Sequence, residues 1–166
     1  MTQETPPQNR TIAEMKALHL EMMAAIRAAC TQFGVVMPLI LWSNRMTASA
    51  GRASAKKLTF SVPLLRAAPH EFCMEVAVHE AAHFIDFQRR GKSDHGAVWR
   101  QIMAELGYPA ADRCHTLDRS HLYRYAVICT KCQRTLVRYT RRPAPDLVRS
   151  KRSACCYAVL RVRPIT

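Results

Sequence analysis

The stretch His79-Glu80-Ala81-Ala82-His83 decides the fold of this 166-residue chain, and it has the pattern HExxH. Apolar residues recur at helical spacing around it, and Pro69 and Glu71 predict the start of that helix and Gly91 its end. In a helix, a spacing of four places both imidazoles on one face, where they can share a tetrahedral zinc ion. Glu80 is then placed to take a proton from the water that such a zinc ion activates. The pattern indicates metal-assisted hydrolysis.

A third ligand is expected, because zinc hydrolases usually bind the metal through three side chains and leave the fourth position to water. His95 is the candidate, since a helix hairpin would return it to the metal across the turn at 90–93. The extended pattern HExxHxxGxxH is excluded, because Asp86 and Arg89 stand at its glycine and third histidine. Asp86 is either a carboxylate that orients a ligand imidazole or a solvated charge. The alternative third ligands are His70, Glu105, His115 and His121.

The segments around this motif predict an α+β domain over residues 11–112, preceded by a disordered leader at 1–10. Thr11 is expected to cap a first helix that Gly34 ends. Its apolar positions recur every three or four residues: Ile12, Met15, Leu18, Met22, Ile26, Ala29 and Phe33. Residues 35–65 predict two or three antiparallel strands, and a further helix is expected to start after Ser93-Asp94.

Positive charge is concentrated in the C-terminal third of the chain. Residues 1–112 contain 12 Lys and Arg against 10 Asp and Glu, whereas residues 113–166 contain 13 against 2. An excess of this kind favours a polyanionic partner, most directly nucleic acid, with a merely solvated surface as the alternative. Because 49% of all residues are apolar, the chain can bury a core and is not a disordered basic tail.

The same third contains a CxxC pair, Cys129 and Cys132, followed by the adjacent residues Cys155 and Cys156. Two CxxC pairs would indicate a zinc ribbon, but the second pair of cysteines here is adjacent. Adjacent residues in a strand point to opposite faces of the sheet. Cys155 and Cys156 can therefore both bind only where the backbone is irregular. Three arrangements are open: all four cysteines bind one zinc ion, the segment is metal-free, or one of the adjacent pair binds together with Cys114, His115 or His121.

Basic residues with an interleaved tyrosine lie between the two cysteine pairs. Arginine can contact phosphates and tyrosine can stack on bases, which suits DNA binding that tolerates any sequence. No base-reading helix is evident, so we expect no sequence specificity. The residues predicted to bind nucleic acid are Arg138, Tyr139, Arg141, Arg142, Arg149, Lys151 and Arg152.

The N-terminal residues are polar, and the longest apolar run, at 35–42, is interrupted by Pro38. The sequence therefore predicts neither a signal peptide nor a membrane span. We expect a soluble, monomeric cytoplasmic protein associated with the nucleoid, not secreted and without a membrane partner. In a reducing compartment cysteines are metal ligands or buried thiols, and Cys30 and Cys73 are expected to be the latter.

The ordered set of motifs resembles the SprT-like metallopeptidases, the group that contains the Spartan proteases, over about residues 12–160. The resemblance is carried by Trp42-Ser43-Asn44-Arg45-Met46-Thr47, Ala50-Gly51-Arg52, Leu58-Thr59-Phe60-Ser61, Val78-His79-Glu80-Ala81-Ala82-His83 and Asp94-His95-Gly96-Ala97-Val98-Trp99. It implies a zincin-like core of an N-terminal helix, a small antiparallel sheet, the HExxH helix and a following helix. A small β zinc-ribbon-like tail over 113–166 completes the expected α+β fold.

The resemblance also implies roles for single residues: His79, His83 and His95 as zinc ligands and Glu80 as the base. We therefore expect a zinc metalloendopeptidase, stimulated by DNA, that cleaves proteins crosslinked to or tightly bound on DNA. It would use one catalytic zinc ion and a second, structural one in the tail. The alternatives are a non-catalytic zinc-containing nucleic-acid-binding module of a transcription or repair complex, and a hydrolase of small or peptidic substrates.

Overall fold

The computed structural model describes residues 9–111 and 119–165, which fall into two compact units with their boundary after Leu117. The boundary expected after residue 112, most of the leader, Cys114 and His115 lie outside the described residues. Among the helices that are described, none combines the length and the apolar character that crossing a bilayer requires. Each unit is described by itself.

The first unit begins with helix α1 (Ile12–Gln32), which starts and ends where the sequence predicts. Thr11 accepts a hydrogen bond from the backbone of Glu14, and the Glu14 carboxylate accepts one from the backbone of Thr11, at 3.2 and 2.7 Å. Gly34 follows the helix with a φ of 66°, a conformation that glycine adopts without strain. Ile12 is an exception to the predicted apolar stripe, since 74% of it is exposed at the first turn. The buried stripe of α1 begins at Met15.

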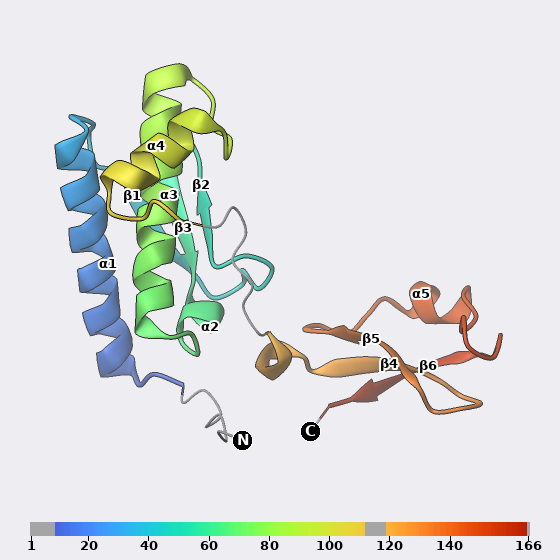
Figure 1. The fold of residues 1–166 in the computed structure, drawn as a ribbon. Helices are drawn as coiled ribbons and strands as arrows, with labels where there is room; N and C mark the ends of the chain where they lie inside the picture. The colour runs from blue at the N-terminus through green and yellow to red at the C-terminus, as the bar shows by residue number, and fades with distance from the viewer. Residues whose placement is uncertain (1–8, 112–118, 166) are drawn as a thin grey trace. The chain divides into compact units, whose positions relative to one another are not determined.

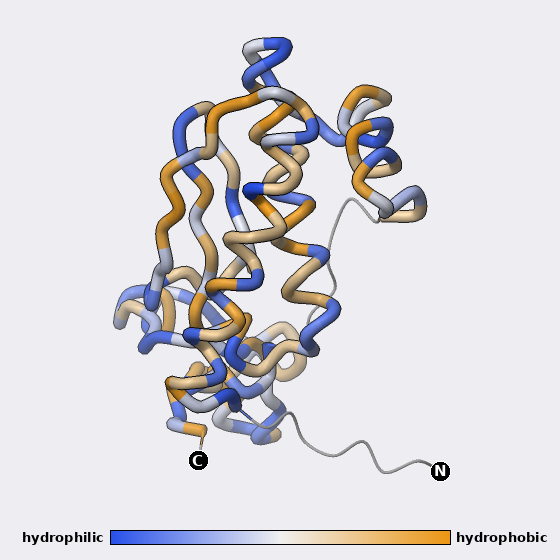
Figure 2. The backbone as a smooth tube through the Cα atoms, turned by 90° about the vertical axis from the view of Figure 1, so that its left-hand side faces the viewer, coloured by the Kyte–Doolittle hydropathy of each residue, from blue (hydrophilic) through white to orange (hydrophobic). Residues whose placement is uncertain are grey.

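Helix α3 (His70–Arg90) is the central element of this unit and carries the HExxH sequence. It packs against α1 along one side and against the sheet on another (Figure 1). Gly91 ends it in the left-handed conformation, with its N–H donating to the carbonyl of Phe87, as the sequence predicts. Hydrophobic and hydrophilic stretches alternate along the long helices, so each has an apolar side for the core (Figure 2).

The sheet consists of β1 (Leu39–Ser43), β2 (Gly51–Ala53) and β3 (Lys57–Ser61), in the order β1-β3-β2. It is mixed, because β3 pairs antiparallel with β2 but parallel with β1. The expected all-antiparallel sheet is therefore wrong. The segment between β1 and β2 carries the chain to the far edge, and the hairpin from β2 then places β3 in the space left between them.

Two further helices complete the unit. Helix α2 (Val62–Leu65) is a single turn capped by the Ser61 side chain, which accepts a hydrogen bond from the backbone of Leu64. Helix α4 (Ala97–Glu105) crosses α3 and buries Trp99, Ile102 and Met103 against it (Figure 1). It starts two residues after the predicted position, at Ala97 in place of His95, so His95 lies in the turn that precedes α4.

The second unit is a three-stranded antiparallel sheet of β4 (Tyr125–Cys129), β5 (Thr135–Tyr139) and β6 (Leu160–Pro164), in the order β5-β4-β6. The central strand β4 is buried from Ala126 to Cys129. A short 3-10 helix, η1 (Ser120–Leu122), precedes the sheet, and helix α5 (Pro145–Arg149) lies between β5 and β6 in sequence. The unit agrees with the small β tail that the sequence predicts.

Candidate active site

Three histidines from the first unit converge at one point. His79 and His83 lie one turn apart on α3, and the turn before α4 brings His95 to them. The Nε2 atom of His95 lies 3.0 Å from that of His83 and 3.2 Å from that of His79. Histidine Nε2 atoms that bind one tetrahedral zinc ion at about 2.05 Å lie about 3.3 Å apart. The three side chains therefore fit a shared metal ion and could bind zinc.

Trp99 forms the floor of this cluster. It is fully buried in α4, and the centroids of all three imidazole rings lie within 5.4 Å of its indole ring. The indole therefore limits how far each imidazole can tilt. Trp99 lies one turn after His95. The way α4 packs against α3 therefore affects the positions of the three imidazole rings.

The environment of His83 keeps its imidazole neutral, as a metal ligand must be. Burial, and secondly the nearby His95, lower the pKa of His83 to about 4. His83 therefore has an unprotonated nitrogen throughout the neutral pH range. Its Nδ1 atom lies 2.7 Å from the Ser93 hydroxyl, while its Nε2 atom faces the other two histidines.

Glu80 lies beside the cluster and is 7% exposed. Its carboxylate accepts a hydrogen bond from the backbone of Ala53 on β2. Burial raises the pKa of Glu80 to about 7, although this hydrogen bond and the charge of Arg52 act in the opposite direction. A carboxylate with a pKa near neutrality suits a group that both accepts and returns a proton.

The side chain of Glu80 fits because residue 51 is glycine. A Cβ atom at Gly51 would lie 2.5 Å from Glu80 Cγ and 2.7 Å from Glu80 Oε1, closer than real Cβ atoms approach. In the sequence this glycine stands out only as part of a motif. Its role depends on a contact between two segments far apart in the chain, so no local pattern could have revealed it.

An open cleft of about 500 Å³ contains the cluster. Its wall runs along residues 48–53, and His79, Glu80, His83 and His95 lie on the opposite side. The site is thus accessible to a substrate, and one side of the three-histidine cluster faces open space.

Strand β2 forms the rim of this cleft and is an edge of the sheet. Ala50 and Ser54, on either side of it, are hydrogen-bonded to Ser61 and Lys57 of β3. Since the direction of backbone groups alternates along a strand, those of Gly51 and Ala53 point away from β3. One of them, the N–H of Ala53, reaches Glu80. The others are available to an extended peptide.

The alternative third ligands lie elsewhere. His70, at the start of α3, contacts the carboxylate of Glu21 at 2.6 Å, and Glu105 accepts a hydrogen bond from Gln101. His121 belongs to the second unit and to neither ligand cluster among the described residues. Asp86 is fully buried and paired with Arg90, so it is not a solvated charge.

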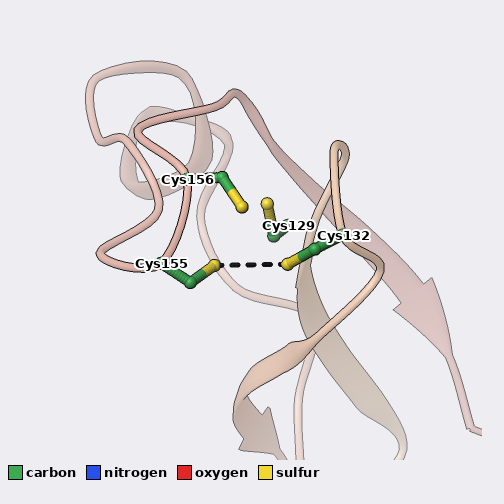
Figure 3. Close-up of side chains that lie close together, drawn as sticks. All are labelled: Cys129, Cys132, Cys155 and Cys156. Atoms are coloured by element: carbon green, nitrogen blue, oxygen red, sulfur yellow. Dashed lines mark hydrogen bonds between the residues drawn. The ribbon is translucent and has the colours of Figure 1, made fainter.

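Four cysteines form a second cluster, in the second unit. The Sγ atoms of Cys129, Cys132, Cys155 and Cys156 all lie within 4.8 Å of one another. Figure 3 shows the four side chains pointing toward a common centre, and the Sγ atoms of Cys132 and Cys155 are 3.4 Å apart. This four-cysteine cluster could bind zinc, as in a zinc ribbon. Of the three arrangements that the sequence leaves open, the geometry matches the one with all four cysteines.

An irregular turn lets the adjacent cysteines face the same point. The N–H of Tyr157 donates to the carbonyl of Ser153, and Tyr157 has a φ of 52°, so residues 153–157 form a tight turn rather than a strand. Gln133, directly after the other pair, also has a positive φ, of 60°. A second CxxC pair ending at Cys156 would have its first cysteine at position 153. The residue at that position is Ser153. Cys155 thus supplies the fourth thiol from a neighbouring position.

Ser153 also interacts with the cluster. It is 1% exposed, and its hydroxyl donates to the Cys129 sulfur while accepting from the N–H of Ala158. This hydrogen bond and those from the backbone of Cys132 and Lys131 lower the pKa of Cys129 to about 6, which favours the thiolate that binds metal. Burial raises the pKa of Cys73 to about 11, as expected for an inert core thiol.

The predicted nucleic-acid-binding side chains are accessible in the second unit. Arg138, Arg141, Arg142, Arg149, Lys151 and Arg152 are exposed, and Tyr139 is half-buried. Over residues 123–165 the structure shows no salt bridge, so these charges are not neutralised by neighbouring carboxylates.

A cavity of about 290 Å³ lies in the same unit and is lined by Tyr123, Arg138 and Arg163, among others. Of these three, only Arg138 was predicted from the sequence to bind nucleic acid. The strand β4 pairs with β5 on one side and with β6 on the other. Ala126 of β4 is opposite Arg138 of β5 and Arg163 of β6, which brings the two arginines to the same level of the sheet.

Comparison with known proteins agrees with this geometry. A comparison with curated proteins finds no match. The model of the SprT-like family matches residues 25–121, more than half of the chain, and this range includes all three histidines and Glu80. The chain therefore belongs to the SprT-like family.

Proposed function

We propose that the protein is a zinc-dependent protease that cleaves proteins crosslinked to or tightly bound on DNA, and that its second unit holds it on the DNA. The observation that supports catalysis most strongly is the convergence of His79, His83 and His95 beside Glu80 in an open cleft. A purely structural metal site would have four protein ligands and no cleft. Membership of the SprT-like family supports the same proposal.

A polypeptide is the substrate that the rim of the cleft fits best. The N–H and C=O of Gly51 and the C=O of Ala53 point away from β3 and can pair with an extended chain as one more strand of the sheet. Such pairing would place a peptide bond of the substrate between β2 and the histidine cluster. The substrate would be bound through its backbone, with little selection among side chains.

The residues of this chain have separate parts in the reaction. The Nε2 atoms of the three histidines would hold the metal, and Glu80 would accept a proton from the attacking water at a carboxylate oxygen and later return it to the leaving amine. When bound, a zinc ion supplies Lewis acidity, which polarises the scissile carbonyl and lowers the pKa of water. The hydrogen bond from Ala53 orients the Glu80 carboxylate toward β2, the side on which the substrate would lie.

The proposal of DNA binding rests on the second unit. Its exposed arginines lack acidic partners over residues 123–165, and Tyr123 lies with Arg138 and Arg163 around one cavity. Arginine contacts phosphate and aromatic rings stack on bases, so this surface suits single-stranded or duplex DNA without sequence selection. Binding to DNA would raise the local concentration of protease at proteins attached to the same molecule.

The test is cleavage of a DNA-binding protein by the zinc-loaded full chain, with and without DNA. We expect faster cleavage with DNA, and a loss of about 10²- to 10⁴-fold in rate for Glu80→Gln. Glu71→Gln, on the exposed first turn of the same helix, is the matched control and should cleave like wild type. Equal substrate loss with wild type and Glu80→Gln would exclude catalysis and favour the non-catalytic zinc module. Unchanged cleavage on adding DNA would contradict stimulation by DNA.

A further inference from the structure

The ion pair between the buried Asp86 and the more exposed Arg90 lies next to the histidine cluster and is not used by the proposed reaction. Asp86 is completely buried, and Arg90 donates to both of its carboxylate oxygens, at 2.6 Å each. These two residues lie one turn apart near the end of α3, directly after the HExxH sequence. A buried carboxylate with a bidentate arginine is ionised and can only accept hydrogen bonds.

Ser93 connects this ion pair to a metal ligand. Its hydroxyl donates to the Asp86 carboxylate, and its oxygen lies 2.7 Å from Nδ1 of His83. A serine hydroxyl has one proton, and here Asp86 takes it. The hydrogen bond between Ser93 and His83 must then use a proton on His83 Nδ1.

That proton fixes which nitrogen of His83 is free. A neutral imidazole has one N–H, so protonation at Nδ1 leaves Nε2 with its lone pair. Nε2 is the atom that faces His79 and His95. The hydrogen bonds from His83 to Ser93 and from Ser93 to Asp86 therefore present the correct nitrogen to the metal before it arrives.

The same ion pair also holds the turn that carries the third ligand. Arg90 reaches Asp94 at 3.5 Å, the backbone of Asp94 donates to Asp86, and the side chain of Asp94 accepts from the N–H of Gly96 at 2.7 Å. His95 lies between Asp94 and Gly96, so its backbone is fixed on both sides.

We propose that Ser93, held by the Asp86–Arg90 ion pair, is a positioning residue for the metal site. It sets the tautomer of His83 and, together with Asp94, keeps the His95 turn against α3. Partners of this kind, one hydrogen bond removed from the metal, typically change metal affinity about 10- to 100-fold. The inference rests on the metal site of the proposed function but not on proteolysis.

The first test is the tautomer of His83 in the full chain freed of metal, read from long-range proton–nitrogen NMR spectra of the histidine rings. We expect His83 protonated at Nδ1 in wild type, and protonated at Nε2 for a substantial share of molecules in Ser93→Ala. Protonation at Nε2 in the wild-type chain would overturn the proposal, whatever the behaviour of any variant.

The second test is zinc affinity of the three-histidine site, measured by competition with a chelator and followed at the His83 ring protons so that the four-cysteine cluster does not contribute. Ser93→Ala should bind about 10- to 100-fold more weakly. Ser93→Thr retains the hydroxyl and should bind like wild type, as should Lys92→Ala, the matched control in the same turn. Wild-type affinity in Ser93→Ala would overturn the proposal. A protein that meets both expectations but cleaves no substrate would refute the proposed function and leave this inference intact.

Discussion

Glu80 packs so closely against the backbone of Gly51 that a methyl group at position 51 would lie 2.5 Å from its Cγ atom. The base of the proposed reaction is therefore positioned by a strand rim that precedes it by 29 residues. This close approach supports the first prediction.

Gly51→Ala should displace Glu80 and slow catalysis while the metal stays bound. A displacement of about 1 Å at a catalytic group can reduce the rate about 10²-fold. Steady-state kinetics should show the decrease mainly in kcat, with zinc content and unfolding temperature close to wild type, because Gly51 lacks a positive φ and alanine causes no backbone strain there. A wild-type kcat in this variant would contradict the prediction, since it would show that the position of Glu80 can change without slowing the reaction.

Glu80 should also make the stability of the metal-free chain depend on pH. Because burial raises its pKa to about 7 from 4.5, the folded state keeps the proton in a range where the unfolded state releases it. The folded state therefore loses stability as the pH rises from about 4.5 to 7, by about 3 kcal/mol at most. Glu80→Gln removes this dependence.

Urea unfolding of the metal-free chain at pH 8 and pH 4.5 tests this expectation. Glu80→Gln should exceed wild type in free energy of unfolding at pH 8 and differ much less at pH 4.5. Glu71→Gln, in the exposed first turn of α3, is the control. An equal difference between Glu80→Gln and wild type at both pH values would contradict the linkage.

The four-cysteine cluster should account for one of two bound zinc ions. Replacing both Cys132 and Cys155 by serine removes two thiols that lie 3.4 Å apart, so metal analysis should fall from two zinc ions per chain to one. The three-histidine cluster lies in the other unit and should keep its metal. Cys30→Ala, which removes a buried thiol outside the cluster, should retain both. Two zinc ions in the double variant would show that the cluster does not bind the metal.

Arg138 and Arg163 should contribute to DNA affinity mainly through charge. Replacing both by alanine should weaken binding, and each phosphate that is no longer neutralised should reduce the dependence of log affinity on log salt by about 1. Fluorescence anisotropy over a salt series measures this slope. Arg100→Ala, an exposed arginine on α4 in the first unit, is the control. A slope unchanged in the double variant would place the DNA on another surface.

Local signals in the sequence predicted the elements that local interactions determine. The Thr11 capping box, the Gly91 helix end and the four-residue spacing of His79 and His83 each involve residues within one turn. His95 was also predicted to join them, because only a short turn separates it from α3. The structure brings its Nε2 atom within 3.2 Å of both other ligands.

Interactions between distant segments were beyond sequence reasoning. The parallel pairing of β1 with β3 depends on where the β2 hairpin returns the chain, and the pattern of apolar residues is the same for either direction. The turn that directs Cys155 and Cys156 toward one centre depends on Ser153 and on the positive φ of Tyr157. Ser93 was overlooked because an isolated serine in a polar turn has no distinguishing pattern.

The free edge of β2 has a consequence for how substrates would be chosen. Backbone N–H and C=O groups are the same in every protein, so a cleft that recognises them cannot distinguish one extended chain from another. Other proteins would then be protected from cleavage in two ways. A compactly folded protein offers no extended segment to the cleft, and a freely diffusing protein is seldom close to it. The second unit would tether the enzyme to the nucleic acid. The position at which it binds and the reach of this tether would then decide which polypeptides are cut.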